Sequence, residues 1–148
     1  MIFRPTDAAG HDTMLTGRRI LVVEDRYLLA KETDRMLRRL GCEPVGPAAD
    51  AAGAFALLER EIDGGGGRLD AAVLDIHLGD GETVFPLAEE LRRRGVPFLL
   101  ATGYGSPGIP DAWRAAPRIE KPFAARDLAA ALLVLIAAAA PFPRRDAR

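Results

Sequence analysis

Several features are scarce in this chain of 148 residues, and each scarcity narrows what the protein can be. The single cysteine, Cys42, cannot form an internal disulfide, which fits a reducing, cytoplasmic compartment. Twenty Lys and Arg residues nearly balance 21 Asp and Glu residues, so charge gives no attraction to nucleic acid or to an anionic membrane. The longest apolar run, residues 128–140, is too short to span a bilayer, and residues 1–16 lack the apolar block of a signal peptide.

The chain is expected to contain one domain between two tails. Residues 1–17 are polar and without periodicity, which predicts an N-terminal tail. Pro141 and Pro143 follow the last apolar segment, so residues 141–148 are expected to form a C-terminal tail. Residues 18–140 remain as a domain large enough for one hydrophobic core.

Within this domain, short apolar runs alternate with stretches of helical periodicity. The apolar runs predict strands at residues 19–23, 42–47, 71–74, 96–101 and 118–120. The periodic stretches predict helices at residues 29–40, 51–62, 84–94 and 124–139. Residues 106–110 are rich in proline and glycine, so any helix before the fifth strand must be short, near residues 111–115.

The strands read as continuous apolar runs, which is typical of an α/β fold whose parallel sheet is covered by helices on both faces. Ligands of such sheets bind beyond the carboxyl ends of the strands. The residues expected at these ends are Glu24, Asp25, Asp75, Thr102 and Lys121, the last being one of only two lysines in the chain.

This set of side chains is suited to phosphoryl chemistry. Three neighbouring carboxylates repel one another unless a cation joins them, and Mg²⁺ (or Mn²⁺) prefers such oxygen ligands. Lys121 adds a compact positive charge and Thr102 a hydroxyl donor, which together suit the oxygens of a phosphoryl group. Asp75 is the expected nucleophile, forming an acyl phosphate.

At this point the chain resembles the receiver domains of two-component response regulators. The resemblance spans residues 18–140 and rests on segments 21–25, 73–81, 101–103 and 121–123. It implies a flavodoxin-like (CheY-like) three-layer sandwich with strand order 2-1-3-4-5. It also implies that a sensor histidine kinase phosphorylates Asp75 and that the Lys121–Pro122 bond is cis.

The same resemblance assigns roles to individual residues. Glu24, Asp25, Asp75 and the main-chain carbonyl of His77 would hold Mg²⁺. Thr102 would turn towards the phosphoryl group, and Lys121 would pair with it.

Two positions bear on the expected readout. Arg118 stands where typical receivers carry a switching Tyr or Phe, so the signal is expected to leave through Thr102 and Tyr104. Residues 97–105 resemble the subgroup nicknamed "FAT GUY", although Leu99 stands where that motif usually has Phe. Members of that subgroup tend to work with histidine kinases of the histidine-tryptophan-glutamate class.

The chain is therefore expected to be a stand-alone phosphoacceptor that signals by protein–protein contact rather than an enzyme. The last helix is apolar around much of its circumference, so it either forms a homodimer or docking contact or simply exposes scattered leucines. Two other function classes stay open: a receiver-like module that binds without phosphorylation, and a metal-dependent phosphohydrolase. The latter usually has a second Asp where this chain has His77.

Overall fold

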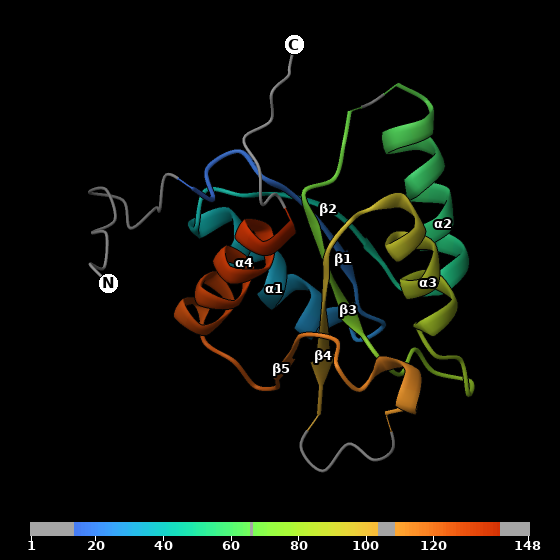
Figure 1. The fold of residues 1–148 in the computed structure, drawn as a ribbon. Coiled ribbons are helices and arrows are strands. Elements are labelled where there is room, and N and C mark those ends of the chain that lie inside the picture. Colours follow the sequence, from blue (N-terminus) through green and yellow to red (C-terminus); the bar gives the residue numbers. More distant parts are fainter. Residues whose placement is uncertain (1–13, 66, 104–108, 140–148) are drawn as a thin grey trace.

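The computed structural model describes residues 14–65, 67–103 and 109–139, and its centre is a parallel sheet of five strands (Figure 1). The strands are β1 (Arg19–Val23), β2 (Glu43–Ala48), β3 (Ala71–Asp75), β4 (Phe98–Thr102) and β5 (Arg118–Glu120). Their order is β2-β1-β3-β4-β5, and every neighbouring pair is parallel. The predicted α/β fold and strand order are confirmed.

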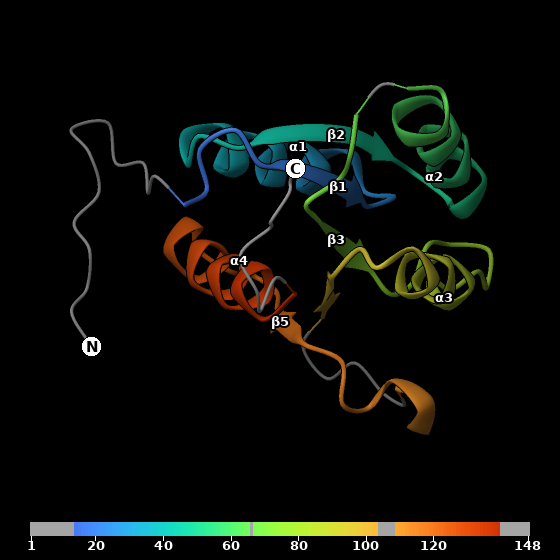
Figure 2. The same cartoon turned by 45° about the horizontal axis from the view of Figure 1, so that its top comes forward.

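Helices cover both faces of this sheet (Figures 1 and 2). Helices α1 (Tyr27–Arg39) and α4 (Ala125–Ala139) lie on one face, and α2 (Ala51–Leu58) and α3 (Phe85–Arg94) lie on the other. Successive strand residues point to opposite faces, so Val22 and Val73 join the core under α1 and α4, while Leu21 and Leu74 join the core under α2 and α3. None of the helices in the described residues is both long and apolar enough to cross a membrane.

Two strands begin later than their apolar runs suggest. The amide of Cys42 donates to the carbonyl of Leu37 at 2.9 Å, and the amide of Val96 donates to the carbonyl of Leu91 at 2.9 Å. Both residues therefore satisfy carbonyls at the end of the preceding helix instead of opening a strand. Hydrophobicity alone does not distinguish an apolar residue that ends a helix from one that begins a strand.

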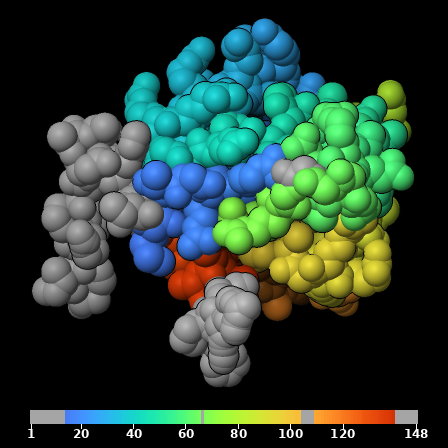
Figure 3. Space-filling model, turned by 90° about the horizontal axis from the view of Figure 1, so that it is seen from above, coloured from blue at the N-terminus to red at the C-terminus, as the bar shows by residue number. Residues whose placement is uncertain are grey.

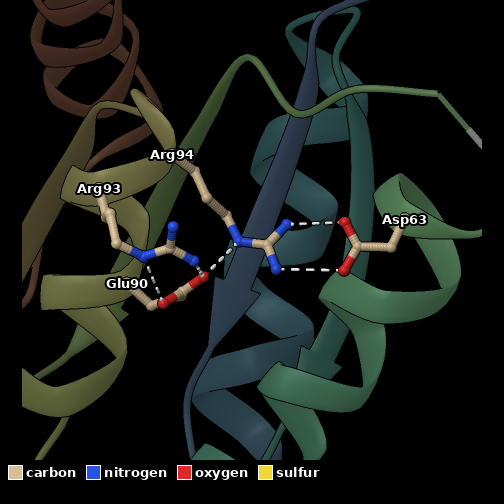
Figure 4. A network of polar contacts seen from close by, with 4 residues as sticks. All are labelled: Asp63, Glu90, Arg93 and Arg94. Carbon is tan, nitrogen blue, oxygen red and sulfur yellow. Dashed lines mark hydrogen bonds and ion pairs between the residues drawn. The ribbon is translucent and has the colours of Figure 1, made fainter.

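The ends of the helices on the second face follow from local sequence. The Asp50 side chain accepts from the amide of Gly53 at 2.8 Å and caps α2. Helix α2 continues into a π-helical turn, η1 (Glu59–Asp63). Arg94 joins this turn to α3, because its guanidinium donates to the two oxygens of Asp63 at 3.0 and 3.1 Å and to Glu90 at 2.7 Å (Figure 4). Arg93 pairs with the same glutamate.

Gly95 ends α3 in the left-handed conformation, with φ of 78°. A Cβ atom is disfavoured there by about 1–2 kcal/mol, whatever the surrounding space. We therefore expect Gly95→Ala to lower the free energy of unfolding by about 1 kcal/mol in urea titrations. Gly95→Asn is the matched control, because asparagine tolerates this conformation better; equal losses for both variants would contradict the conformational explanation.

A short 3₁₀ turn, η2 (Asp111–Trp113), stands where the short helix was predicted. Its Trp113 is buried against the rings of Phe85 and Phe98, with centroids 5.6 and 5.9 Å away. The guanidinium carbon of Arg92 lies 4.1 Å from the centroid of the Trp113 ring. These contacts fix the turn on α3 and β4 without a regular helix.

The packed part of the chain begins before residue 18. Leu15 is fully buried in the core under α1 and α4, and the amide of Gly17 donates to the carbonyl of Gly41 at 2.8 Å. In the space-filling view, this blue segment packs against the cyan segment that joins α1 to β2 (Figure 3). Leu15 and the amide of Gly17 therefore attach residues 14–17, which were predicted to belong to the N-terminal tail, to the domain.

The last helix turns its large side chains inward. Leu128, Leu132, Leu135 and Ile136 are buried, whereas Val134 is 70% exposed and its exposed neighbours are alanines. The outer face of α4 thus exposes one large apolar side chain, Val134, among small alanines. The homodimer through this helix stays a prediction, with less exposed apolar surface to support it.

Candidate phosphoryl and metal site

The strand register brings the predicted site residues to one edge of the sheet. Val23 of β1 pairs with Leu74 of β3, so Glu24 and Asp75 follow neighbouring positions. Asp75 in turn pairs with Ala101 of β4, which places Thr102 one residue further along that strand. The amide of Lys121 donates to the carbonyl of Thr102 at 2.7 Å, which anchors the residue just after β5 at the same edge.

Three carboxylates gather there. Glu24, Asp25 and Asp75 each offer an oxygen within 4.8 Å of the others. Glu24 and Asp75 are only 6% and 9% exposed, whereas Asp25 is exposed to solvent. Buried anions at this separation are costly without a cation, and hard oxygen ligands suit Mg²⁺.

Gly79, in the loop after β3, leaves room beside this cluster. Its φ is 85°, and a Cβ atom built on it would lie 3.2 Å from Oδ2 of Asp25. Any side chain at this position would crowd the exposed carboxylate. The donor set and this open space fit a divalent ion held by Glu24, Asp25 and Asp75.

Lys121 bridges two of these acids. Its Nζ donates to Oδ1 of Asp75 at 3.0 Å and to Oε1 of Glu24 at 2.9 Å. The predicted pairing of Lys121 with a phosphoryl group stays a prediction, and its bond to Glu24 was not expected, because the resemblance assigned Glu24 to the metal alone. The peptide bond between Lys121 and Pro122 is cis, as the resemblance implies.

Burial and neighbouring charge shift the pKa of the central aspartate. Desolvation raises the pKa of Asp75 to about 6; the hydrogen bond from Lys121 opposes this, and the negative charge of Glu24 reinforces it. For Lys121, burial alone would lower the pKa, but its bonds to Glu24 and Asp75 outweigh this and raise it. Near neutral pH the site therefore holds a largely ionised Asp75 carboxylate beside the charged Lys121 ammonium group.

This shift predicts a dependence of stability on pH. Between pH 3.8 and about 6 the folded chain binds more protons at Asp75 than the unfolded chain, so the free energy of unfolding falls as pH rises through this window. At about 1.4 kcal/mol for each pKa unit, the full loss is about 3 kcal/mol. Asp75→Asn removes this titration. In EDTA we therefore expect the free energy of unfolding of the variant, relative to that of the wild type, to rise by up to about 3 kcal/mol from pH 4 to pH 7.5, measured by urea unfolding. A stability difference that is flat or reversed across this range would contradict it.

The remaining predicted residues occupy different settings. Thr102 is 9% exposed, and its hydroxyl has no hydrogen bond to any described residue, so it is available to a ligand. His77 has an exposed side chain and pairs with Thr83 in an isolated bridge; the role of its carbonyl stays a prediction. Arg118 is exposed on β5 and donates to the carbonyl of Arg114. Tyr104 lies outside the described residues.

Comparison with solved structures identifies the family. SdrG from Sphingomonas melonis Fr1 is 38% identical over 79% of this chain and 97% of its own, with a TM-score of 0.67. A response regulator receiver protein from Sinorhizobium medicae WSM419 shares the fold at 23% identity, over 83% of this chain and 97% of its own, with a TM-score of 0.65. The chain belongs to the response regulator receiver family.

A third receiver domain bears on the acid cluster. It comes from the sensor histidine kinase PA1611 of Pseudomonas aeruginosa PAO1 and was solved with a magnesium ion coordinated in its active site cleft. It is 26% identical over 82% of this chain and 98% of its own, with a TM-score of 0.63. No family model matches the chain, and no curated protein sequence matches it either.

Proposed function

We propose that Asp75 accepts a phosphoryl group from a phosphohistidine of a sensor histidine kinase, with a divalent metal ion bound beside it. The observation that carries this proposal is the position of Asp75, buried between two further carboxylates and 3.0 Å from Nζ of Lys121. An unreactive structural aspartate has no need of such a costly setting.

The reaction makes one bond and breaks one. A carboxylate oxygen of Asp75 attacks phosphorus, the P–N bond to the histidine breaks, and the imidazole leaves with the electron pair. Lys121 already lies beside Oδ1 of Asp75, so a short movement lets it pair with a phosphoryl oxygen instead. The unpartnered hydroxyl of Thr102 supplies a second donor from β4.

A bound Mg²⁺ would neutralise negative charge on the transferred group. Glu24, Asp25 and Asp75 would hold it, with the carbonyl of His77 as a further ligand. In this account Glu24 has two tasks, because it also accepts the second hydrogen bond of Lys121. A bound metal ion would therefore share the charge of this buried glutamate with Lys121.

Output by protein–protein contact in the cytoplasm, and a partner kinase of the histidine-tryptophan-glutamate class, belong to the same proposal. Two features support an unusual readout. Arg118 is exposed where the aromatic switch of typical receivers would stand, and in the described residues 109–117 before β5 the helical structure is limited to the short turn η2. Both fit the "FAT GUY" assignment and leave the loop after Thr102 as the expected route of the signal.

Phosphotransfer profiling tests the proposal. Purified histidine kinases of several classes, each labelled on its histidine, are mixed with the receiver in Mg²⁺ for short times. We expect rapid transfer to the receiver from a small number of kinases, with those of the histidine-tryptophan-glutamate class among them. Transfer that is equally fast to Asp75→Asn would contradict the proposed acceptor, and no transfer from any kinase would favour the non-phosphorylated module.

A further inference from the structure

A cavity of about 190 Å³ lies beneath the site, between α1 and the sheet. Its walls are mainly apolar and come from β1, α1, β3, β4 and the segment after β5. The lining side chains that the argument uses are Val22, Thr33, Met36, Val73 and Phe123. For comparison, a dry engineered cavity of about 150 Å³ with aliphatic walls takes up benzene.

One wall carries a buried polar group without a partner. Thr33 is 7% exposed, and its hydroxyl has no hydrogen bond to any described residue. A buried hydroxyl left unpaired destabilises the fold, so this site favours a ligand that can form a hydrogen bond with Thr33. Thr33 sits on α1 and belongs to neither the metal cluster nor the lysine pair.

The charges around the cavity select among ligands of similar size. The carboxylates of Glu24, Glu32 and Asp75 line it, and Lys121 is the one cation among its lining residues. Lys121 is already paired with Glu24 and Asp75. An anionic ligand therefore meets excess negative charge, whereas an ammonium group is attracted.

We propose that this cavity is a binding site for a small molecule with an apolar body about the size of a benzene ring and an ammonium head. The body fills the space between α1 and the sheet, and the head bonds to the Thr33 hydroxyl and the neighbouring carboxylates. The head shares Glu24 and Asp75 with the site described above, but the inference does not rest on the function proposed there.

Three probes of nearly equal size test it: benzylamine, benzyl alcohol and benzoate. Each is titrated at pH 7.5 in EDTA into protein carrying labelled methyl groups, and the methyl signals of Val22, Val73 and Met36 are followed by NMR. We expect a dissociation constant on the order of 1 mM for benzylamine, from the few heavy atoms it buries. We also expect the affinity for benzyl alcohol to be at least about 5-fold lower, because it lacks the positive charge that the carboxylates attract. The affinity for benzoate should be lower still, because the carboxylates repel its negative charge.

Variants of the cavity-lining residue Thr33 test whether benzylamine binds inside the cavity. Thr33→Leu fills the cavity and is expected to weaken benzylamine binding at least about 10-fold while leaving the chain folded. Thr33→Val keeps the volume and removes only the hydroxyl, so about 5-fold weaker binding is expected. Val134→Leu, on the exposed face of α4, is the matched control and should bind like the wild type.

The outcomes separate clearly. Shifts confined to the lining methyls, in the order amine, alcohol, benzoate, support the site. No shift at these methyls, equal binding of benzoate, or unchanged binding by Thr33→Leu would overturn it.

Discussion

Asp75→Asn is expected to lower incorporation of a phosphoryl group from a small acyl phosphate, such as acetyl phosphate, by more than about 100-fold, because the amide is not a nucleophile. The reaction is followed in Mg²⁺ by separating phosphorylated from unphosphorylated protein on an affinity gel. A small donor needs no docking surface, so the result depends on the site alone. The loss should occur without unfolding, since the carboxylate is destabilising at neutral pH.

Asp80→Asn is the matched control. Asp80 follows Asp75 closely in sequence and is exposed, but it is not one of the three clustered acids. We expect this variant to be labelled at the wild-type rate. Equal labelling of Asp75→Asn and the wild type would show that another residue accepts the phosphoryl group.

Asp25→Asn is expected to weaken Mg²⁺ binding by about 10- to 100-fold, measured by isothermal titration calorimetry. Asp25 is the exposed member of the cluster and lies beside Gly79, so its side chain contributes ligand charge and little packing. Its removal relieves repulsion, and the metal-free variant should be at least as stable as the wild type.

Glu82→Gln is the control for the predicted loss of Mg²⁺ affinity. Glu82→Gln removes one negative charge in the loop after β3, outside the cluster, and should change Mg²⁺ affinity less than about 3-fold by screening alone. Equal losses for Asp25→Asn and Glu82→Gln would mean that net charge, and not a metal ligand, governs the binding.

The positions of Glu24, Asp25, Asp75 and Thr102 could be predicted because each lies at the carboxyl end of a short apolar strand. The runs before Asp25 and Asp75 are buried on both faces, and parallel pairing then places their carboxyl ends at one edge. The caps at Asp50 and Gly95 could be predicted for a similar reason, since the signal lies within a few residues.

Contacts between distant segments could not be predicted. The hydrogen bond from Lys121 to Glu24 joins residues 97 positions apart and depends on how far two side chains reach. The burial of Leu15 depends on the space left between α1 and α4. The cavity beside Thr33 likewise reflects side-chain volumes that sequence periodicity does not record. Periodicity identifies which face of an element is buried, but not how completely that face is filled.

Mapping the phosphorylated residue in the wild-type chain tests the central claim most directly. The protein is incubated with acetyl phosphate and Mg²⁺, and the acyl phosphate is reduced with borohydride, which converts a phosphorylated aspartate into homoserine. Peptide mass spectrometry then locates the change. We predict homoserine at position 75 only, and none when Mg²⁺ is replaced by EDTA. Homoserine at Asp25 or another aspartate, 2-amino-5-hydroxypentanoate in place of Glu24, or no homoserine at all in Mg²⁺, would contradict the account.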